Sequence, residues 1–146
     1  MSSVVRKSPR SIDAAVKSLN YLDGILAKMQ ANEAGAADAL MLDAEGFVAE
    51  ATAANAFVVR DGVLRTPPTT AALAGITRRT VLELAEPLGI PTSVERLTPG
   101  DFYTADEAFL TGTATGIVAI GSVDGRRLTG APGSMSERLI GAYRAT

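Results

Sequence analysis

The 146-residue sequence contains no cysteine and no histidine. Without cysteine, disulfides, thiolate metal sites and cysteine nucleophiles are excluded together. Without histidine, Ser-His and Cys-His dyads, histidine-ligated metals and the commonest general base near neutral pH are excluded as well. Any catalysis must therefore use lysine, tyrosine, carboxylates, hydroxyls or a bound cofactor, and no metal site is expected.

A strongly basic face and a long apolar run are also missing. The formal net charge is −2, and the basic residues are scattered apart from a small cluster within residues 6–10. Nucleic acid is therefore not an expected partner. No apolar run reaches the roughly 18 residues of a membrane helix, and residues 1–10 lack the apolar segment of a secretion signal. We expect one soluble, cytoplasmic unit with no membrane partner.

Apolar residues at three- and four-residue spacing predict helices. The first covers residues 18–34 and is expected to bury one stripe, which consists of Leu19, Leu22, Ile25, Leu26 and Met29. A second begins at Gly75-Ile76-Thr77 and closes near Gly89, and a third covers residues 134–143. Thr98 followed by Pro99 predicts the start of a short helix that runs to residue 103.

Short runs rich in strand-forming residues predict strands at 11–16, 39–42, 47–49, 56–59, 63–66, 92–97, 107–110 and 117–123. The turn signals Glu45-Gly46 and Asp61-Gly62 make four antiparallel strands the simplest account of residues 39–66. Strands and helices in this mixed order predict an α+β, or mixed α/β, domain with several antiparallel pairs.

Lys17 lies between the strand predicted at 11–16 and the first predicted helix. An amine at such a boundary, in an apolar neighbourhood, suits imine formation, because desolvation favours the neutral and nucleophilic form. Taken alone, the same placement also describes a solvated surface lysine.

Further segments carry a family resemblance when they are taken in order. They are Lys17 to Leu22, Val48 to Thr52 with Asn55 and Phe57, Asp61 to Leu64 with Thr66 to Pro68, Gly75 to Arg78, Ala105 to Glu107, Leu110 to Ala114, and Val123 to Arg126. Through nearly its whole length the chain resembles the fold-type-IV pyridoxal-phosphate (PLP) enzymes. That group includes branched-chain aminotransferases, D-amino-acid aminotransferases and aminodeoxychorismate lyases.

The resemblance implies roles for four residues around the ring of PLP. Lys17 would hold PLP as an internal aldimine and, once freed by substrate, would move a proton between the substrate α-carbon and the cofactor. Glu50 would face the pyridine nitrogen and keep it protonated, which preserves the ring as an electron sink. Asn55 would support the loop that aims Glu50. Tyr21, one helical turn past Lys17, would hydrogen-bond the ring oxygen.

Two glycine-containing motifs are expected to bind the phosphate and the substrate. Gly75-Ile76-Thr77 marks a helix start, where unpaired backbone N–H groups suit a phosphate, and the resemblance implies that Ile76 and Thr77 bind it. In Thr111-Gly112-Thr113-Ala114, the glycine allows a close approach and the threonines offer hydroxyls. By resemblance, Thr113 reaches the phosphate, and the amides of Thr113 and Ala114 meet the substrate carboxylate.

The resemblance also bears on domain organisation and partners. Family members place a smaller N-terminal domain ahead of the lysine, which supplies an arginine for the phosphate, whereas sixteen residues precede Lys17 here. We therefore expect residues 1–16 to be the remnant of an interdomain segment with a leading strand, and residues 17–146 to be the PLP-binding C-terminal domain. The resemblance further implies a homodimer with sites near its interface.

The activity expected from the resemblance is PLP-dependent transamination of branched-chain amino acids (Val, Leu or Ile) with 2-oxoglutarate. Thr115-Gly116 stands where many members have an acidic residue and a proline, so the side chain and stereochemistry of the substrate stay open. Two other enzyme activities remain, an aminodeoxychorismate lyase and a D-amino-acid aminotransferase. A third alternative is a truncated domain that binds PLP or a partner protein without turnover.

Overall fold

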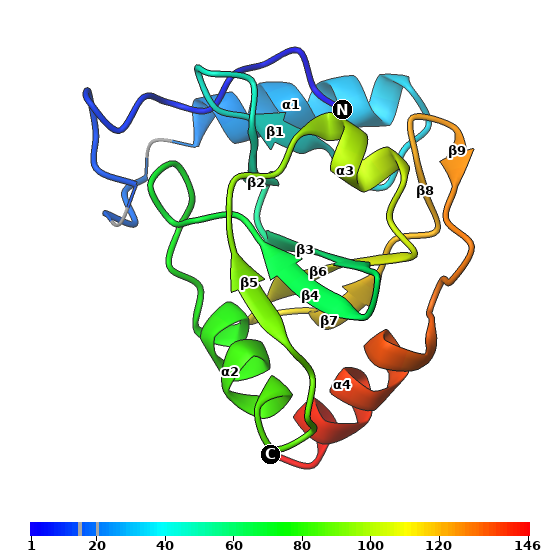
Figure 1. Cartoon of the computed structure of the whole chain (residues 1–146). Helices are drawn as coiled ribbons and strands as arrows, with labels where there is room; N and C mark the ends of the chain where they lie inside the picture. The colour runs from blue at the N-terminus through cyan, green and yellow to red at the C-terminus, as the bar shows by residue number, and fades with distance from the viewer. Residues whose placement is uncertain (15, 20) are drawn as a thin grey trace.

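The structure, a computed structural model, describes residues 1–14, 16–19 and 21–146 (Figure 1). Its helices are α1 (Leu22–Glu33), α2 (Ile76–Ala85), α3 (Pro99–Tyr103) and α4 (Ser134–Arg144). Its strands are β1 (Leu40–Leu42), β2 (Val48–Ala51), β3 (Asn55–Arg60), β4 (Val63–Thr66), β5 (Thr92–Val94), β6 (Glu107–Gly112), β7 (Gly116–Ala119), β8 (Ser122–Val123) and β9 (Arg126–Arg127). The predicted mixed α/β class is confirmed.

No helix within the described residues has the length and apolar character needed to cross a membrane.

Five strands form the central sheet in the order β5-β4-β3-β6-β7, with every pair antiparallel except β4 and β5. The pairs β1-β2 and β8-β9 form separate two-stranded sheets. The predicted antiparallel pairing is therefore confirmed within each of the hairpins β1-β2 and β3-β4. The four strands do not form one sheet, because the chain bends at residues 52–54 and enters β3 in the central sheet.

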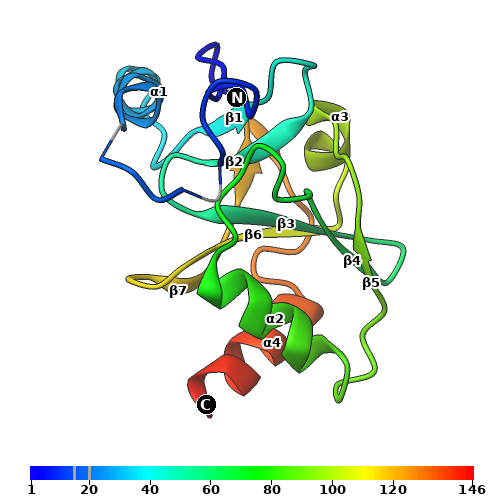
Figure 2. The ribbon, with the colours of Figure 1, turned by 90° about the vertical axis from the view of Figure 1, so that its left-hand side faces the viewer.

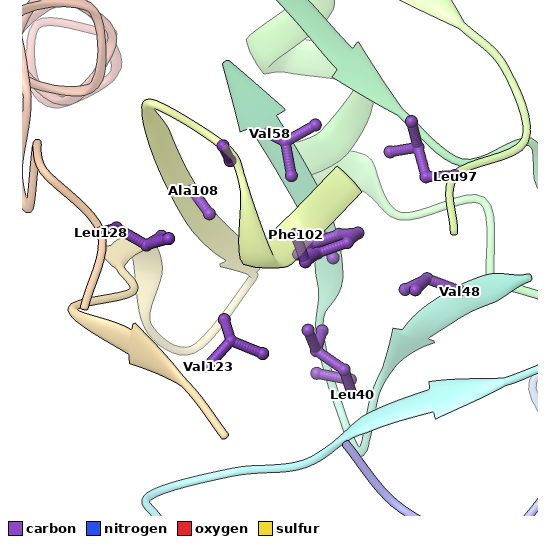
Figure 3. Close-up of a cluster of buried hydrophobic side chains, with 11 residues drawn as sticks. Leu40, Val48, Val58, Leu97, Phe102, Ala108, Val123 and Leu128 are labelled. Carbon is purple, nitrogen blue, oxygen red and sulfur yellow. The ribbon is translucent and has the colours of Figure 1, made fainter. Parts of the chain in front are cut away.

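The central sheet is buried on both faces, which explains the almost continuous apolar sequence of β3. On one face Phe57 stacks on Phe109 of β6, with ring centroids 5.0 Å apart, and packs under α2 and α4. On the other face Val58 belongs to a cluster that surrounds Phe102 of α3 (Figure 3). Figure 2 shows the resulting layers, with α2 and α4 below the sheet and β1, β2 and α3 above it.

Helix α1 packs through small residues, and the stripe expected to be buried is exposed. Ala27 and Ala31 are buried against Met41 of β1, and Gly24 lets the helix approach the Thr52 carbonyl. The side chains of Leu22, Ile25, Leu26 and Met29 are 43–62% exposed, and Leu19 is 93% exposed. The spacing places Leu22, Ile25, Leu26 and Met29 on one face of α1, whereas Leu19 lies before the helix. The prediction of burial was wrong because spacing does not determine which face finds a partner.

The segment that leads into α1 also differs from the prediction. Residues 11–14 and 16 adopt turns, bends or irregular backbone, so no described residue of the predicted 11–16 strand is in a strand. The helix begins at Leu22 rather than near residue 18, because the carbonyl of Tyr21 accepts the first helical bond, from Ile25. The predicted strand at 117–123 is divided into β7 and β8, and β9 was not predicted.

Glu107, a buried carboxylate of β6, holds the start of α4. It accepts hydrogen bonds from the Met135 N–H (3.1 Å), the Ser136 N–H (2.8 Å) and the Ser136 hydroxyl (2.6 Å). Gly133 must lack a side chain because a Cβ there would overlap this carboxylate. A side chain distant in sequence thus provides the helix cap that Gly133 cannot.

We predict that Glu107→Ala lowers the free energy of unfolding by about 2–4 kcal/mol, because buried donors lose their acceptor. The matched control is Glu83→Ala on the exposed side of α2, which should change it by less than about 0.5 kcal/mol. Chemical denaturation of both variants measures the difference. Equal stabilities would contradict the capping role.

Candidate active site

A cavity of about 470 Å³ opens beside the segment before α1, the end of β2, the start of β3, the start of α2 and the end of β6. Figure 2 looks onto this side of the molecule. The volume is typical of a small-molecule site. The cavity brings together the whole set expected to hold a cofactor, namely Lys17, Tyr21, Glu50, Asn55, Gly75, Ile76, Thr77, Gly112 and Thr113. Ala114, expected to contact substrate, is exposed and is not part of the lining.

Glu50 is the buried acid of the cavity, with 5% of the residue exposed. One carboxylate oxygen pairs with the Arg6 guanidinium, and the other accepts a hydrogen bond of 3.1 Å from the Leu73 N–H. Burial raises the pKa of Glu50 above its ordinary value, although Arg6 and the Leu73 N–H act in the opposite direction. Arg6 and the Leu73 N–H thus balance the negative charge of Glu50 only in part. A positive charge placed beside the Glu50 carboxylate would therefore be stabilised.

Arg6 and Asp23 complete the group around Glu50, and sequence reasoning missed both. The Arg6 guanidinium also contacts the Asp23 carboxylate at 3.0 Å, and the Lys7 N–H donates to the same carboxylate at 3.2 Å. Burial works to raise the pKa of Asp23, but these hydrogen bonds and the charge of Arg6 outweigh it and lower the pKa. In the sequence, residues 6–10 form only a basic cluster. No local pattern relates Arg6 to a strand that follows much later in the chain.

Asn55 and Gly75 fix the loop that precedes α2. The Asn55 side-chain amide donates to the Leu73 carbonyl at 2.8 Å, and the Leu73 N–H in turn contacts Glu50. A Cβ on Gly75 would overlap the side-chain oxygen of Asn55. The absence of a side chain at Gly75 thus lets Asn55 reach the loop that contacts Glu50.

The start of α2 and the end of β6 supply polar groups to the same cavity. No side chain among the described residues caps the first turn of α2, and Thr77 in that turn is buried with its hydroxyl 3.5 Å from the Tyr143 hydroxyl. Thr111 is 1% exposed, and its hydroxyl finds no hydrogen-bond partner among the described residues. Because unpaired buried hydroxyls are unfavourable, a polar ligand atom in the cavity would stabilise Thr111.

Lys17 and Tyr21 lie at the mouth of the cavity in an arrangement that the sequence did not predict. Lys17 is exposed, whereas an apolar surrounding was expected. Tyr21 immediately precedes α1, so the expected spacing of one helical turn between the two residues is wrong. Both side chains still line the cavity, because the turns before α1 carry them there.

Together these groups offer an amine at the mouth, a buried carboxylate inside, and the backbone N–H groups of a helix start. The helix start favours an anion and the carboxylate favours a cation. The cavity is therefore suited to a small molecule that carries both an anionic group and a basic nitrogen, and it also contains an amine.

Comparison with known proteins gives concordant findings. The family model described as Amino-transferase class IV matches residues 1–123. The branched-chain-amino-acid aminotransferase of Pseudomonas aeruginosa is 46% identical over 124 residues, which is 84% of this chain and 40% of that protein. The structure of branched-chain amino acid aminotransferase from Thermobaculum terrenum, in its PLP form, has a TM-score of 0.95 at 41% identity. The Escherichia coli structure has a TM-score of 0.96 at 38% identity.

The alignments with these two structures cover 98–99% of this chain and 48–49% of the chains in those structures. This chain thus spans about half the length of the relatives that it matches.

We predict that Gly75→Ala lowers the free energy of unfolding by about 1–3 kcal/mol, because the new Cβ displaces the Asn55 side chain from Leu73. The matched control is Gly141→Ala in α4, where a Cβ meets nothing within 4 Å. It should raise stability by up to about 1 kcal/mol, because alanine favours helix. Denaturant titration of both variants tests this, and a stabilised Gly75→Ala protein would show the prediction to be wrong.

Proposed function

We propose that this chain, which belongs to the class IV amino-transferase family, is the cofactor-holding part of a PLP-dependent aminotransferase that acts on branched-chain amino acids. The observation that carries the proposal is the convergence of Lys17, Glu50 and the start of α2 on one cavity. The names of the relatives support the substrate class.

The residues of the cavity fit PLP on chemical grounds. The hydroxyl of buried Thr111 has no hydrogen-bond partner in the described part of the chain, and a ligand would supply one. The start of α2 would offer its Ile76 and Thr77 N–H groups to a phosphate, and Glu50 would offer a carboxylate to a ring nitrogen. PLP, when bound, supplies an electron sink that stabilises negative charge on the substrate α-carbon.

Lys17 and Glu50 are the proposed proton-handling groups. Lys17 would hold the cofactor through Nζ, and its exposed position at the mouth leaves that amine accessible to a substrate. Once released, Nζ would move a proton at the substrate α-carbon. Glu50 would hold a proton on the ring nitrogen, and its burial strengthens that interaction because water screens it little.

The remaining cavity residues are proposed to orient the two ligands. Tyr21 would hydrogen-bond the ring oxygen, and Asn55 would act through the loop that contacts Glu50. Gly112 lines the cavity, and its lack of a side chain would permit a ligand to approach the backbone closely. Thr113 lines the cavity and Ala114 follows it in the turn, and their amides are the proposed contacts of the substrate carboxylate.

We also propose that 2-oxoglutarate is the amine acceptor, that residues 17–146 form the PLP-binding unit, and that the protein is cytoplasmic. Half-reaction rates with the L- and D-forms of valine, leucine and isoleucine would separate the proposed activity from the D-aminotransferase alternative, and an assay for pyruvate release from aminodeoxychorismate would test the lyase alternative. PLP binding without any turnover would favour the alternative of a binding domain.

We predict that Lys17→Ala abolishes covalent attachment of PLP while the protein stays folded, because an exposed side chain contributes little packing. Borohydride reduction in the presence of PLP, followed by peptide mass spectrometry, should find the cofactor mass on Lys17 of the unchanged protein only. Lys28→Ala in α1 is the control and should retain the attachment. Attachment that persists in Lys17→Ala would exclude Lys17 as the anchor.

A homodimer is also proposed, with the exposed apolar face of α1 as its contact. Ile25 and Met29 line a shallow hollow together with Thr52 and Ala53, and those two residues also line the main cavity. The face is thus continuous with the site, as expected if a second copy of the chain lies beside it. Apolar side chains gathered on one exposed face favour association.

We predict that Ile25→Glu raises the dissociation constant for self-association by at least about tenfold, because a charge would have to leave water. Sedimentation equilibrium measures this. Val94→Glu places the same charge on an exposed apolar position of β5 and should leave association unchanged. A monomeric parent protein, or an Ile25→Glu protein that associates normally, would contradict the proposed contact.

A further inference from the structure

One arginine serves two carboxylates beside the cavity. Separate guanidinium nitrogens of Arg6 contact Glu50 and Asp23, the latter at 3.0 Å. The three side chains are 12%, 7% and 15% exposed, in the order Arg6, Glu50 and Asp23. They also line the same cavity. An isolated Arg6–Glu50 pair would be neutral, whereas the group of three carries one net negative charge.

How the net negative charge is shared between Glu50 and Asp23 depends on the contacts of Asp23. The first turn of α1 carries Asp23, and the Lys7 and Gly24 N–H groups at 3.2 and 2.8 Å keep its carboxylate in place. These contacts, with the charge of Arg6, lower the pKa of Asp23 against the effect of burial, so Asp23 is ionised at neutral pH. The negative charge of Asp23 acts on Glu50 in the opposite sense and contributes to raising its pKa. Asp23 thus offsets part of the effect that Arg6 has on Glu50, although it is the smallest of these influences on the pKa of Glu50.

Two further cations, Lys7 and Lys17, line the cavity. Neither changes the charge balance among Arg6, Asp23 and Glu50 substantially. Lys17 is exposed and Lys7 is only partly buried, so water screens their charges more than those of the buried group. The charge felt inside the cavity near Glu50 is therefore set mainly by Arg6, Asp23 and Glu50.

We propose that Asp23 is a positioning residue for Glu50. By sharing Arg6, it leaves Glu50 with an uncompensated negative charge that is directed at a cationic ring nitrogen in the cavity. The inference rests on the proposed function for the identity of that ring, while the charge balance itself belongs to the protein without cofactor. Sequence reasoning gave Asp23 no role.

The first test uses the cofactor-free protein. Carbon-13 NMR of labelled glutamate carboxyls, assigned with Glu50→Gln, gives the pKa of Glu50. Asp23→Asn should lower it, because Arg6 then serves Glu50 alone, and Asp23→Glu should restore it towards the original value. Asp61→Asn, in the exposed turn between β3 and β4, is the matched control and should leave it unchanged. An unaltered Glu50 titration in Asp23→Asn would overturn the proposal.

The second test uses PLP and its 1-deaza analogue, in which a CH group replaces the ring nitrogen. Asp23→Asn should weaken PLP binding roughly three- to tenfold and leave binding of the analogue unchanged, because only PLP presents a cationic nitrogen. Equal weakening of both would show that Asp23 only shapes the cavity, and would overturn the proposal. If the unchanged protein binds no PLP, the proposed function fails, and the Glu50 titration still decides whether Asp23 controls that carboxylate.

Discussion

The buried carboxylate of Glu50 is the interaction on which the site depends. Its two oxygens contact Arg6, from the start of the chain, and the Leu73 N–H, from the loop before α2. A buried anion must be paired or hydrogen-bonded to remain charged, so β2, the first residues and that loop are held in one arrangement. The cavity is the space that this arrangement leaves open.

The residues that stabilise the fold and the residues that line the cavity lie in different parts of the structure. Most of the buried apolar side chains belong to the clusters on the two faces of the central sheet, and buried Glu107 caps α4. The cavity lies at the end of the sheet, where β3 begins and β6 ends, so polar residues can be placed there without interrupting the core. Backbone ends and short loops on a rigid scaffold are common places for ligand groups, because their direction is set by the scaffold.

Helix α1 contributes both to the packing of the fold and to the proposed contact with a second copy of the chain. Its small residues bring the helix close to β1, and its large apolar residues face outwards beside the site. A helix that packed its large residues inwards would hold Asp23 on another face and could not present it to Arg6. The exposed apolar face and the Arg6–Asp23 contact are therefore two consequences of one orientation of α1.

The sequence by itself determined the elements, the family and most of the cavity. Helical spacing, turn residues and ordered motifs located α2, α3, α4, most of the strands and all the candidate cofactor-binding residues that the cavity brings together, because these signals are local. Tertiary structure alone decided that the large residues of α1 face outwards, that Lys17 is exposed and that residues 11–14 and 16 are not a strand. It also joined Arg6 and Asp23 to Glu50. Contacts between residues far apart in sequence leave no local pattern, so only packing reveals them.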